Sequence, residues 1–160
     1  MELTTTEHVA IPIEAVWAEA TNFAQFEAGL IKRGVALERK GDGDAGEGTA
    51  WEAVVPVSGR KLNAKAHIAR MEAPNELRFE GSGTGIEGHV AARLTSLDAN
   101  TTQIDMTIGL QAKAMGAQVI LQPLRLAKKK LQKQLNTQMG RIARGMEERY
   151  AAARDAADQA

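Results

Sequence analysis

Through the middle of the chain, apolar and polar residues alternate, which is the pattern of β-strands with one buried face. Between residues 35 and 110, six such segments follow one another. The short runs that separate them are rich in Gly, Pro, Asn and Asp, the residues that turns require, and they fall at 41–44, 58–59, 74–75, 81–85 and 98–100. We therefore predict a meander of six antiparallel strands with one dry face and one wet face.

Other periods flank this meander. Residues 3–12 alternate up to Pro12, which predicts a first strand, and apolar residues at helical spacing predict a helix over 13–20, followed by a second short helix capped by Asn22. From 120 to 150, apolar residues recur every three or four positions and form one continuous stripe. Because proline interrupts a straight helix, Pro123 predicts a short helical turn at 116–121 and a main helix from about Gln122. We expect the charged tail at 151–160 to fray.

These elements predict a single α+β domain over residues 1–150. A sheet with one apolar face must bury that face against another element. The C-terminal helix is the predicted element that is long enough, because thirty residues span about 45 Å. We therefore expect it to pack on the concave face of the sheet.

The order of strand, two short helices, six-stranded meander and long helix resembles the helix-grip fold of the polyketide cyclase, StAR-related lipid-transfer and birch-pollen-allergen superfamily. The resemblance is carried by HVAIPIEAVWAEATNF, by KAHIARMEAPNELRFEGSGTGIEGHVAARLTSL and by LQPLRLAKKKLQKQL. The glycine-rich entry to the sixth strand of the chain also looks like the branch of the superfamily that is named after a component of carbon monoxide dehydrogenase, although the Asp-Pro and Cys-Ile-Pro-Gly features of that branch are absent. The superfamily implies a cavity between sheet and helix that holds a lipid, an isoprenoid or an aromatic polyketide.

The many small residues of the chain are consistent with a cavity between the sheet and the helix. The chain has 28 Ala and 15 Gly, and the dry phase of the strands includes Ala53, Ala64, Ala66, Gly88 and Ala92, which leave the middle of the sheet without bulk. Either large helix residues or a ligand must fill such a gap. We expect a hydrophobic ligand to contact Trp51, Val55, Phe79, Val90, Met106, Ile108, Leu131 and Leu135, with Phe26 and Leu30 at the mouth.

Candidate catalytic chemistry is sparse. Cysteine is absent, and His8, His67 and His89 all fall on the polar phase without metal-ligand spacing, so we predict no metal, no cofactor and no catalytic residue. The dry phases are expected to contain no charged residue, which favours a binding protein over an enzyme. A cyclase or dehydratase remains the alternative, since the polar residues at the mouth, Asn22, Gln25, Glu27 and Arg33, cannot be placed from sequence. A purely structural or partner-binding role is a third hypothesis, and it predicts a filled core.

The zero net charge conceals a strong asymmetry. Residues 106–146 contain eight basic residues and no acidic one, whereas residues 1–105 contain 10 basic and 16 acidic residues. On a helix these cations are expected to occupy the side away from Leu124, Leu131 and Leu135 and to form a basic strip. The strip is either a solvated face or a docking surface for an anionic membrane or an acidic protein. The candidate docking residues are Arg125, Lys128, Lys129, Lys130 and Lys133. Nucleic acid is not expected as a partner, because aromatic residues are scarce among the cations.

Neither a membrane span nor a secretory signal is expected. The longest uncharged apolar stretch, 114–124, is about half of the roughly 20 residues that a spanning helix needs. The first residues are Glu2 and a threonine run instead of a basic stretch followed by an apolar one. We expect a cytoplasmic bacterial protein that is a monomer or a dimer.

Overall fold

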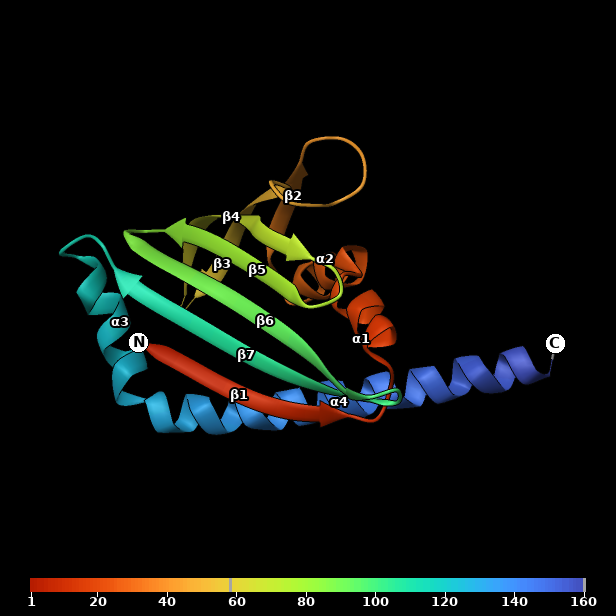
Figure 1. The fold of residues 1–160 in the computed structure, drawn as a ribbon. Helices are drawn as coiled ribbons and strands as arrows, with labels where there is room; N and C mark the ends of the chain where they lie inside the picture. Colours follow the sequence, from red (N-terminus) through yellow and green to blue (C-terminus); the bar gives the residue numbers. More distant parts are fainter. Residues whose placement is uncertain (58, 160) are drawn as a thin grey trace.

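The computed structural model describes residues 1–57 and 59–159 (Figure 1). The strands are β1 (Glu2–Val9), β2 (Ala36–Lys40), β3 (Ala50–Val57), β4 (Arg60–Glu72), β5 (Glu76–Gly83), β6 (Ile86–Asp98) and β7 (Thr101–Ala112). The helices are α1 (Ile13–Ala20), α2 (Phe23–Lys32), α3 (Ala117–Leu126) and α4 (Lys128–Asp158). The strands form one antiparallel sheet in the order β1-β7-β6-β5-β4-β3-β2. The α+β class and the six-stranded meander are thus confirmed, and Ser58 of the predicted turn at 58–59 lies outside the described residues.

Local sequence signals set the start of the helices near the first strand. Pro12 precedes α1, where its fixed φ of −62° suits a helix entry. The Asn22 side chain accepts a hydrogen bond from the backbone N–H of Gln25 at 3.3 Å, as expected of the cap of α2. None of the helices in the described part of the chain is long and apolar enough to cross a membrane.

Strand register assigns every side chain to one of two faces, because residues directly opposite each other in a sheet share a face. Phe79, Val90 and Ile108 are partners across β5, β6 and β7, and Phe79 packs against Phe23 of α2. We call their side of the sheet the helix face. The alternate positions lie on the outer face, where side chains point away from the helices.

Two buried clusters hold the helices to the helix face. The first joins α1 and α4 to β1, β6 and β7, and it comprises Val9, Ile11, Ile13, Val16, Leu94, Ile104, Met139, Ala143 and Met146. The second joins α2 to β3, β4 and β5, and it comprises Phe23, Trp51, Ile68 and Leu77. The two clusters lie toward different parts of the sheet, and Trp17 of α1 packs against both.

The C-terminal helices differ from the sequence prediction. The chain bends at Ala127, one turn after Pro123, instead of between residues 121 and 122. The bend lies here because the two helices pack on different parts of the sheet. Helix α3 packs at the end of β7, whereas α4 runs along the edge strand β1 (Figure 1). Residues 151–158, expected to fray, continue α4 with exposed side chains.

The buried stripe of α4 is also narrower than the apolar stripe of the sequence. Met139, Ala143 and Met146 are buried, whereas Ile142, which the periodicity placed in the stripe, is 43% exposed. A helix that packs against one edge strand buries only a narrow band of its surface, and Ile142 lies about 100° around the helix from Ala143. The helix therefore covers the β1 side of the sheet and leaves the middle less covered.

Candidate functional site

An apolar row in the middle of the helix face is the first candidate site. Phe79, Val90, Ile108 and Leu3 are consecutive partners across β5, β6, β7 and β1. Leu3 is buried, but Val90 is 36% exposed and its neighbours Phe79 and Ile108 are only half-buried. Val90 is therefore an apolar side chain on the face that the helices should cover, and it marks where their cover is incomplete.

The next row holds small residues, as expected, but part of its space is filled. Gly81, Gly88 and Leu110 are partners across β5, β6 and β7. A Cβ atom on Gly88 would lie 2.9 Å from Cδ2 of Leu110, and one on Gly81 would lie 2.8 Å from the backbone oxygen of Lys65. These glycines thus permit close approach of neighbouring atoms, and the free space is smaller than glycine alone suggests.

Three aromatic rings close the α2 end of the row. Phe23, Trp51 and Phe79 have ring centroids 6.0–6.1 Å apart in tilted and edge-to-face pairs, which aromatic side chains favour. Trp51 is 7% exposed and belongs to the buried cluster. Of the predicted aromatic ligand contacts, Trp51 is thus enclosed by protein and Phe79 borders the open row.

A charged group ties α2 to the sheet at the same end. The Glu27 carboxylate accepts hydrogen bonds from Nε of Arg39 and from Nε1 of Trp51, each at 2.9 Å, and also from Nη2 of Arg39. The Arg39 guanidinium holds the pKa of Glu27 below its usual range, and the Trp51 bond adds to this effect against the opposing effect of burial. Glu27 is therefore an ionised anchor and a poor proton donor near neutral pH.

The remaining predicted contacts are divided between the clusters and the surface. Met106 and Leu135 pack beside the first buried cluster, and Leu131 is half-buried near the start of α4. Val55 pairs with Leu62 in a more distant row. On α2, Phe26 is 53% exposed and Leu30 is 41% exposed. The structure therefore brings Phe79, Val90 and Ile108 together in one row, with Met106 in the neighbouring row, and places the other predicted contacts around them or apart.

Sequence reasoning missed two charged residues on the helix face, where it predicted none. Arg39 is the register partner of Trp51, and Glu7 alternates with the buried residues Thr5 and Val9. The signal was present in each strand, because Arg39 continues the phase of Val35 and Leu37, and Glu7 shares the phase of Val9. Both were overlooked because the apolar residues alone defined the phase.

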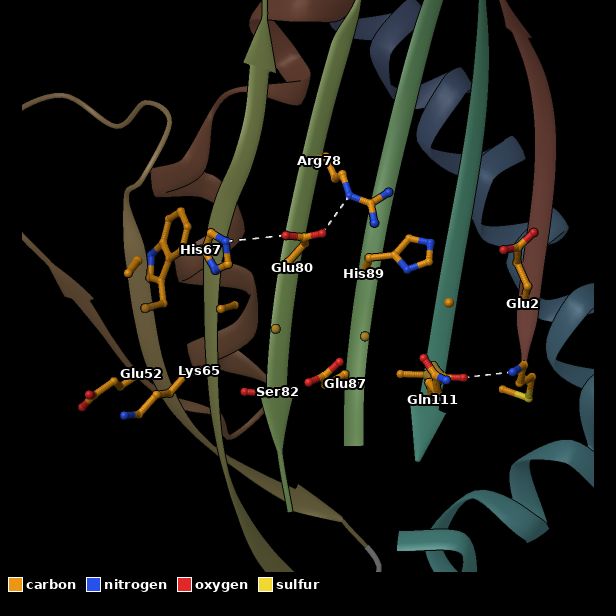
Figure 2. A pocket seen from close by; sticks show the side chains of 18 of the residues that line it. Glu2, Glu52, Lys65, His67, Arg78, Glu80, Ser82, Glu87, His89 and Gln111 are labelled. Carbon is orange, nitrogen blue, oxygen red and sulfur yellow. Dashed lines mark hydrogen bonds and ion pairs between the residues drawn. The ribbon is translucent and has the colours of Figure 1, made fainter. Parts of the chain in front are cut away.

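A hollow of about 1190 Å³ lies on the outer face, not between the sheet and α4 (Figure 2). It crosses the row in which His67, Glu80 and His89 are partners across β4, β5 and β6. Nε2 of His67 lies 3.8 Å from Oε1 of Glu80, whose other oxygen lies 3.1 Å from Nε of Arg78. The ring of His89 covers Gly109, where a Cβ atom would lie 2.2 Å from the ring.

The outer hollow has the composition of a solvated face. Its charged lining residues carry both signs, and His67, Glu80 and Arg78 each have exposed side chains. As expected, His8, His67 and His89 all lie on this face. The described residues contain no group of three or more His, Asp and Glu side chains that could hold a metal ion. Several of these charges form ion pairs, such as Lys40 with Glu52 and Arg78 with Glu80, and the mixture of signs favours no ligand class.

Comparison with known proteins supports the fold. No protein-family model matches the chain, and no curated protein matches it. Among solved structures, a protein of Thermus thermophilus is similar at a TM-score of 0.62 and 20% identity, over 96% of this chain and 99% of that one. Norcoclaurine synthase of Thalictrum flavum is similar at 0.63 and 15%, over 94% and 96% of the two chains. The ZhuI aromatase/cyclase of Streptomyces sp. R1128 is similar at 0.55 and 18%, over 71% and 69%. The chain therefore shares the helix-grip fold of these solved structures.

Proposed function

We propose that the protein binds a hydrophobic small molecule on the helix face of the sheet, against the row of Phe79, Val90 and Ile108. The observation that carries the proposal is the 36% exposure of Val90 in the middle of that row. An apolar side chain on the packing face of a sheet is normally covered by protein. Here the cover from α4 lies mainly over β1, and the cover from α2 ends at the aromatic cluster (Figure 1).

Removal of water from the apolar row would provide the affinity. Each square ångström of apolar surface buried contributes about 25 cal/mol before the costs of ordering the ligand. The row offers little hydrogen-bonding capacity, because its side chains are hydrocarbon and its backbone groups are used in the sheet ladder. The ligand class that fits is therefore apolar: a lipid, an isoprenoid or an aromatic polyketide-like molecule. The same fold occurs in an aromatase/cyclase and in norcoclaurine synthase, which is known in complex with a transition-state analogue, and this supports binding of a small molecule.

The alternative is an enzyme of the cyclase or dehydratase type. Glu27 and Arg39 are the observation that favours an enzyme, because they place ionised groups beside the aromatic end of the row. Both groups are occupied with each other and with Trp51, and the lowered pKa of Glu27 opposes a role as general acid. Binding without chemistry is therefore the preferred function.

The first experiment identifies bound molecules directly. Purified protein is extracted with organic solvent, and the extract is analysed by mass spectrometry against a mock purification. We expect an apolar species in stoichiometric amount. The recovered protein is then titrated with Nile red, a neutral apolar dye, and dye fluorescence is followed. Absence of both a bound species and saturable dye binding would contradict the proposal.

A matched pair of variants locates the site. Val90→Glu adds a charge to the apolar row at a position that already reaches solvent, and we expect at least a tenfold loss of Nile red affinity. Leu97→Glu makes the same change at a residue that is 48% exposed near the end of β6, and we expect its affinity to equal that of the wild type. Circular dichroism establishes that both variants fold. Equal affinity in both variants would place the dye elsewhere.

A mass-spectrometric turnover assay separates binding from catalysis. The extracted molecule is incubated with wild-type protein and with Glu27→Gln, and any new product is sought. The binding proposal expects the molecule to be recovered unchanged from both samples. A product that forms with the wild type and not with Glu27→Gln would support the enzyme instead.

A further inference from the structure

The most exposed large apolar side chains of the described chain gather around α3. Met115 is 95% exposed, Leu126 is 82% exposed and Val119 is 76% exposed, and the other exposed large apolar residues reach at most 56%. Folding leaves these three side chains almost fully in water, although each could stabilise a protein core if it were buried. Large apolar side chains that are exposed close together on one element typically mark an interaction site.

Helix α3 is apolar on two sides, which explains the exposure. Its inner side carries the buried residues Ala117 and Leu121, which attach it to the end of the sheet. Val119 and Leu126 are seven residues apart and thus about 20° apart around the helix, so they share the outer side. The protein satisfies only one of the two apolar sides, and the outer side has no partner within the described residues.

Cations lie at the end of this helix and follow it in the sequence. Arg125, Lys128, Lys129 and Lys130 occupy the bend between α3 and α4, and Lys133 follows one turn later. None of these five forms an ion pair with another described residue. Because residues 106–146 contain no acid, nothing nearby in the sequence neutralises them. We call residues 115–130, with their exposed apolar and basic side chains, the α3–α4 elbow.

The elbow lies at one tip of the molecule. Figure 1 shows α3 beyond the ends of β6 and β7, at the opposite end from the projecting C-terminal turns of α4. At this tip the backbone N–H groups of Lys113 and Ala114 donate to the carbonyl of Gly85, which fixes the start of the elbow against the β5–β6 turn. The elbow therefore lies at the periphery of the fold.

We propose that the α3–α4 elbow docks on the surface of an anionic lipid membrane. Such a surface accepts apolar side chains into the boundary between headgroups and acyl chains, and it attracts Lys and Arg to its anionic headgroups. A second copy of the chain is a poor occupant, because a symmetric interface would bring two sets of unpaired cations together. An acidic protein satisfies the cations but requires its own apolar groove for the side chains of the elbow. This role goes beyond binding of a small molecule and does not depend on it.

Vesicle flotation tests the electrostatic part. The full chain is mixed with vesicles of phosphatidylcholine alone or of phosphatidylcholine with phosphatidylserine, in about 0.1 M and about 1 M salt, which changes the screening length from about 10 Å to about 3 Å. We expect binding only to the anionic vesicles at low salt. Equal binding to both vesicle types, or anionic binding that ignores salt, would overturn the proposal.

A charge variant and a matched control locate the surface. Each cation near an anionic membrane contributes about fivefold in affinity, so Lys128→Gln/Lys129→Gln/Lys130→Gln is expected to lose about a hundredfold. The control Lys32→Gln/Arg60→Gln/Lys61→Gln removes three exposed cations elsewhere. Its affinity for the vesicles is expected to fall less than threefold, which is less than the effect of removing one cation that faces the membrane. Equal losses in the two triple variants would show a general charge effect and would contradict docking through the elbow.

Apolar substitutions test insertion. Val119→Ser/Leu126→Ser is expected to weaken binding at least tenfold, while Leu97→Ser, at another exposed apolar residue, leaves binding unchanged. In Leu126→Trp, we expect the indole fluorescence to shift to shorter wavelength on anionic vesicles, beyond the response of the two native tryptophans. Absence of that shift in a variant that floats would overturn insertion. Binding to soluble polyglutamate in preference to anionic vesicles would assign the elbow to an acidic protein instead.

Discussion

Removal of the Glu27 carboxylate tests whether α2 is held to the sheet by the contact with Trp51 and Arg39. In Glu27→Ala the indole N–H of Trp51 loses its acceptor at 2.9 Å, in a residue that is 7% exposed. A buried donor without a partner costs about 1 to 3 kcal/mol. No energy is counted for Arg39, whose guanidinium gains water when its partner leaves. We therefore expect the free energy of unfolding to fall by about 2 kcal/mol, and Tm to fall by about 4 to 8 °C.

Urea unfolding at pH 7, followed by tryptophan fluorescence, measures this difference. Glu27→Gln keeps an oxygen acceptor for Trp51 and is expected to lose less than Glu27→Ala. Glu148→Ala removes an exposed carboxylate of α4 that forms no ion pair within the described residues, and we expect a change within about 0.5 kcal/mol. If Glu27→Ala is as stable as this control, the carboxylate does not anchor α2, and the reasoning fails.

The pH dependence of the stability difference is an independent test of the Glu27 contact. The pKa of Glu27 is lowered in the folded protein, chiefly by Arg39, so the ionised form favours folding. This contribution is fully present above the unfolded pKa of a glutamate, about 4.3, and is lost as pH falls through the lower folded pKa. The stability difference between wild type and Glu27→Gln should therefore be largest near neutral pH and shrink below about pH 4. A difference that grows on acidification would refute the assignment.

Three further tests address the packing and one buried hydrogen bond. Met139→Ala, at a core position that is 3% exposed, should lower the free energy of unfolding in urea by about 2 to 5 kcal/mol. Ile142→Ala, at a position that is 43% exposed, should lower it by less than about 1 kcal/mol. Similar losses in the two variants would mean that α4 is rotated from the position described. Gly109→Ala should destabilise by displacing the ring of His89, and Gly109→Ala/His89→Ala should be more stable than the single glycine variant, so failure of this rescue would contradict the ring position. Thr102→Val removes a fully buried hydroxyl that donates to a backbone carbonyl at 2.9 Å, and thermal unfolding should report a loss of about 1 to 3 kcal/mol; an unchanged Tm would contradict that bond.

The two proposals concern different parts of the fold, the helix face and the α3–α4 elbow, and can be tested separately. The apolar row depends on Val90, and its tests measure bound molecules. The elbow depends on Leu126 and the neighbouring lysines, and its tests measure membrane attachment. If the protein binds an apolar molecule without attaching to membranes, the first proposal holds and the second fails, and the reverse result has the opposite meaning.

The sequence by itself determined the local structure. Alternation and turn residues located the six strands of the meander, and Asn22 marked the start of α2, because these signals act over a few neighbouring residues. The excess of cations near the C-terminal helices was also visible in the sequence, since charge is a property of composition and position alone.

Tertiary structure alone decided which surfaces are covered. Ile142 satisfies the helical period as well as Met139, but only the rotation of α4 on β1 separates an exposed residue from a buried one. The contact between Glu27 and Arg39 joins a helix to an edge strand, and the exposure of Val90 depends on how far α4 reaches across the sheet. These features depend on the relative placement of segments distant in the chain, and periodicity within one segment does not contain that information.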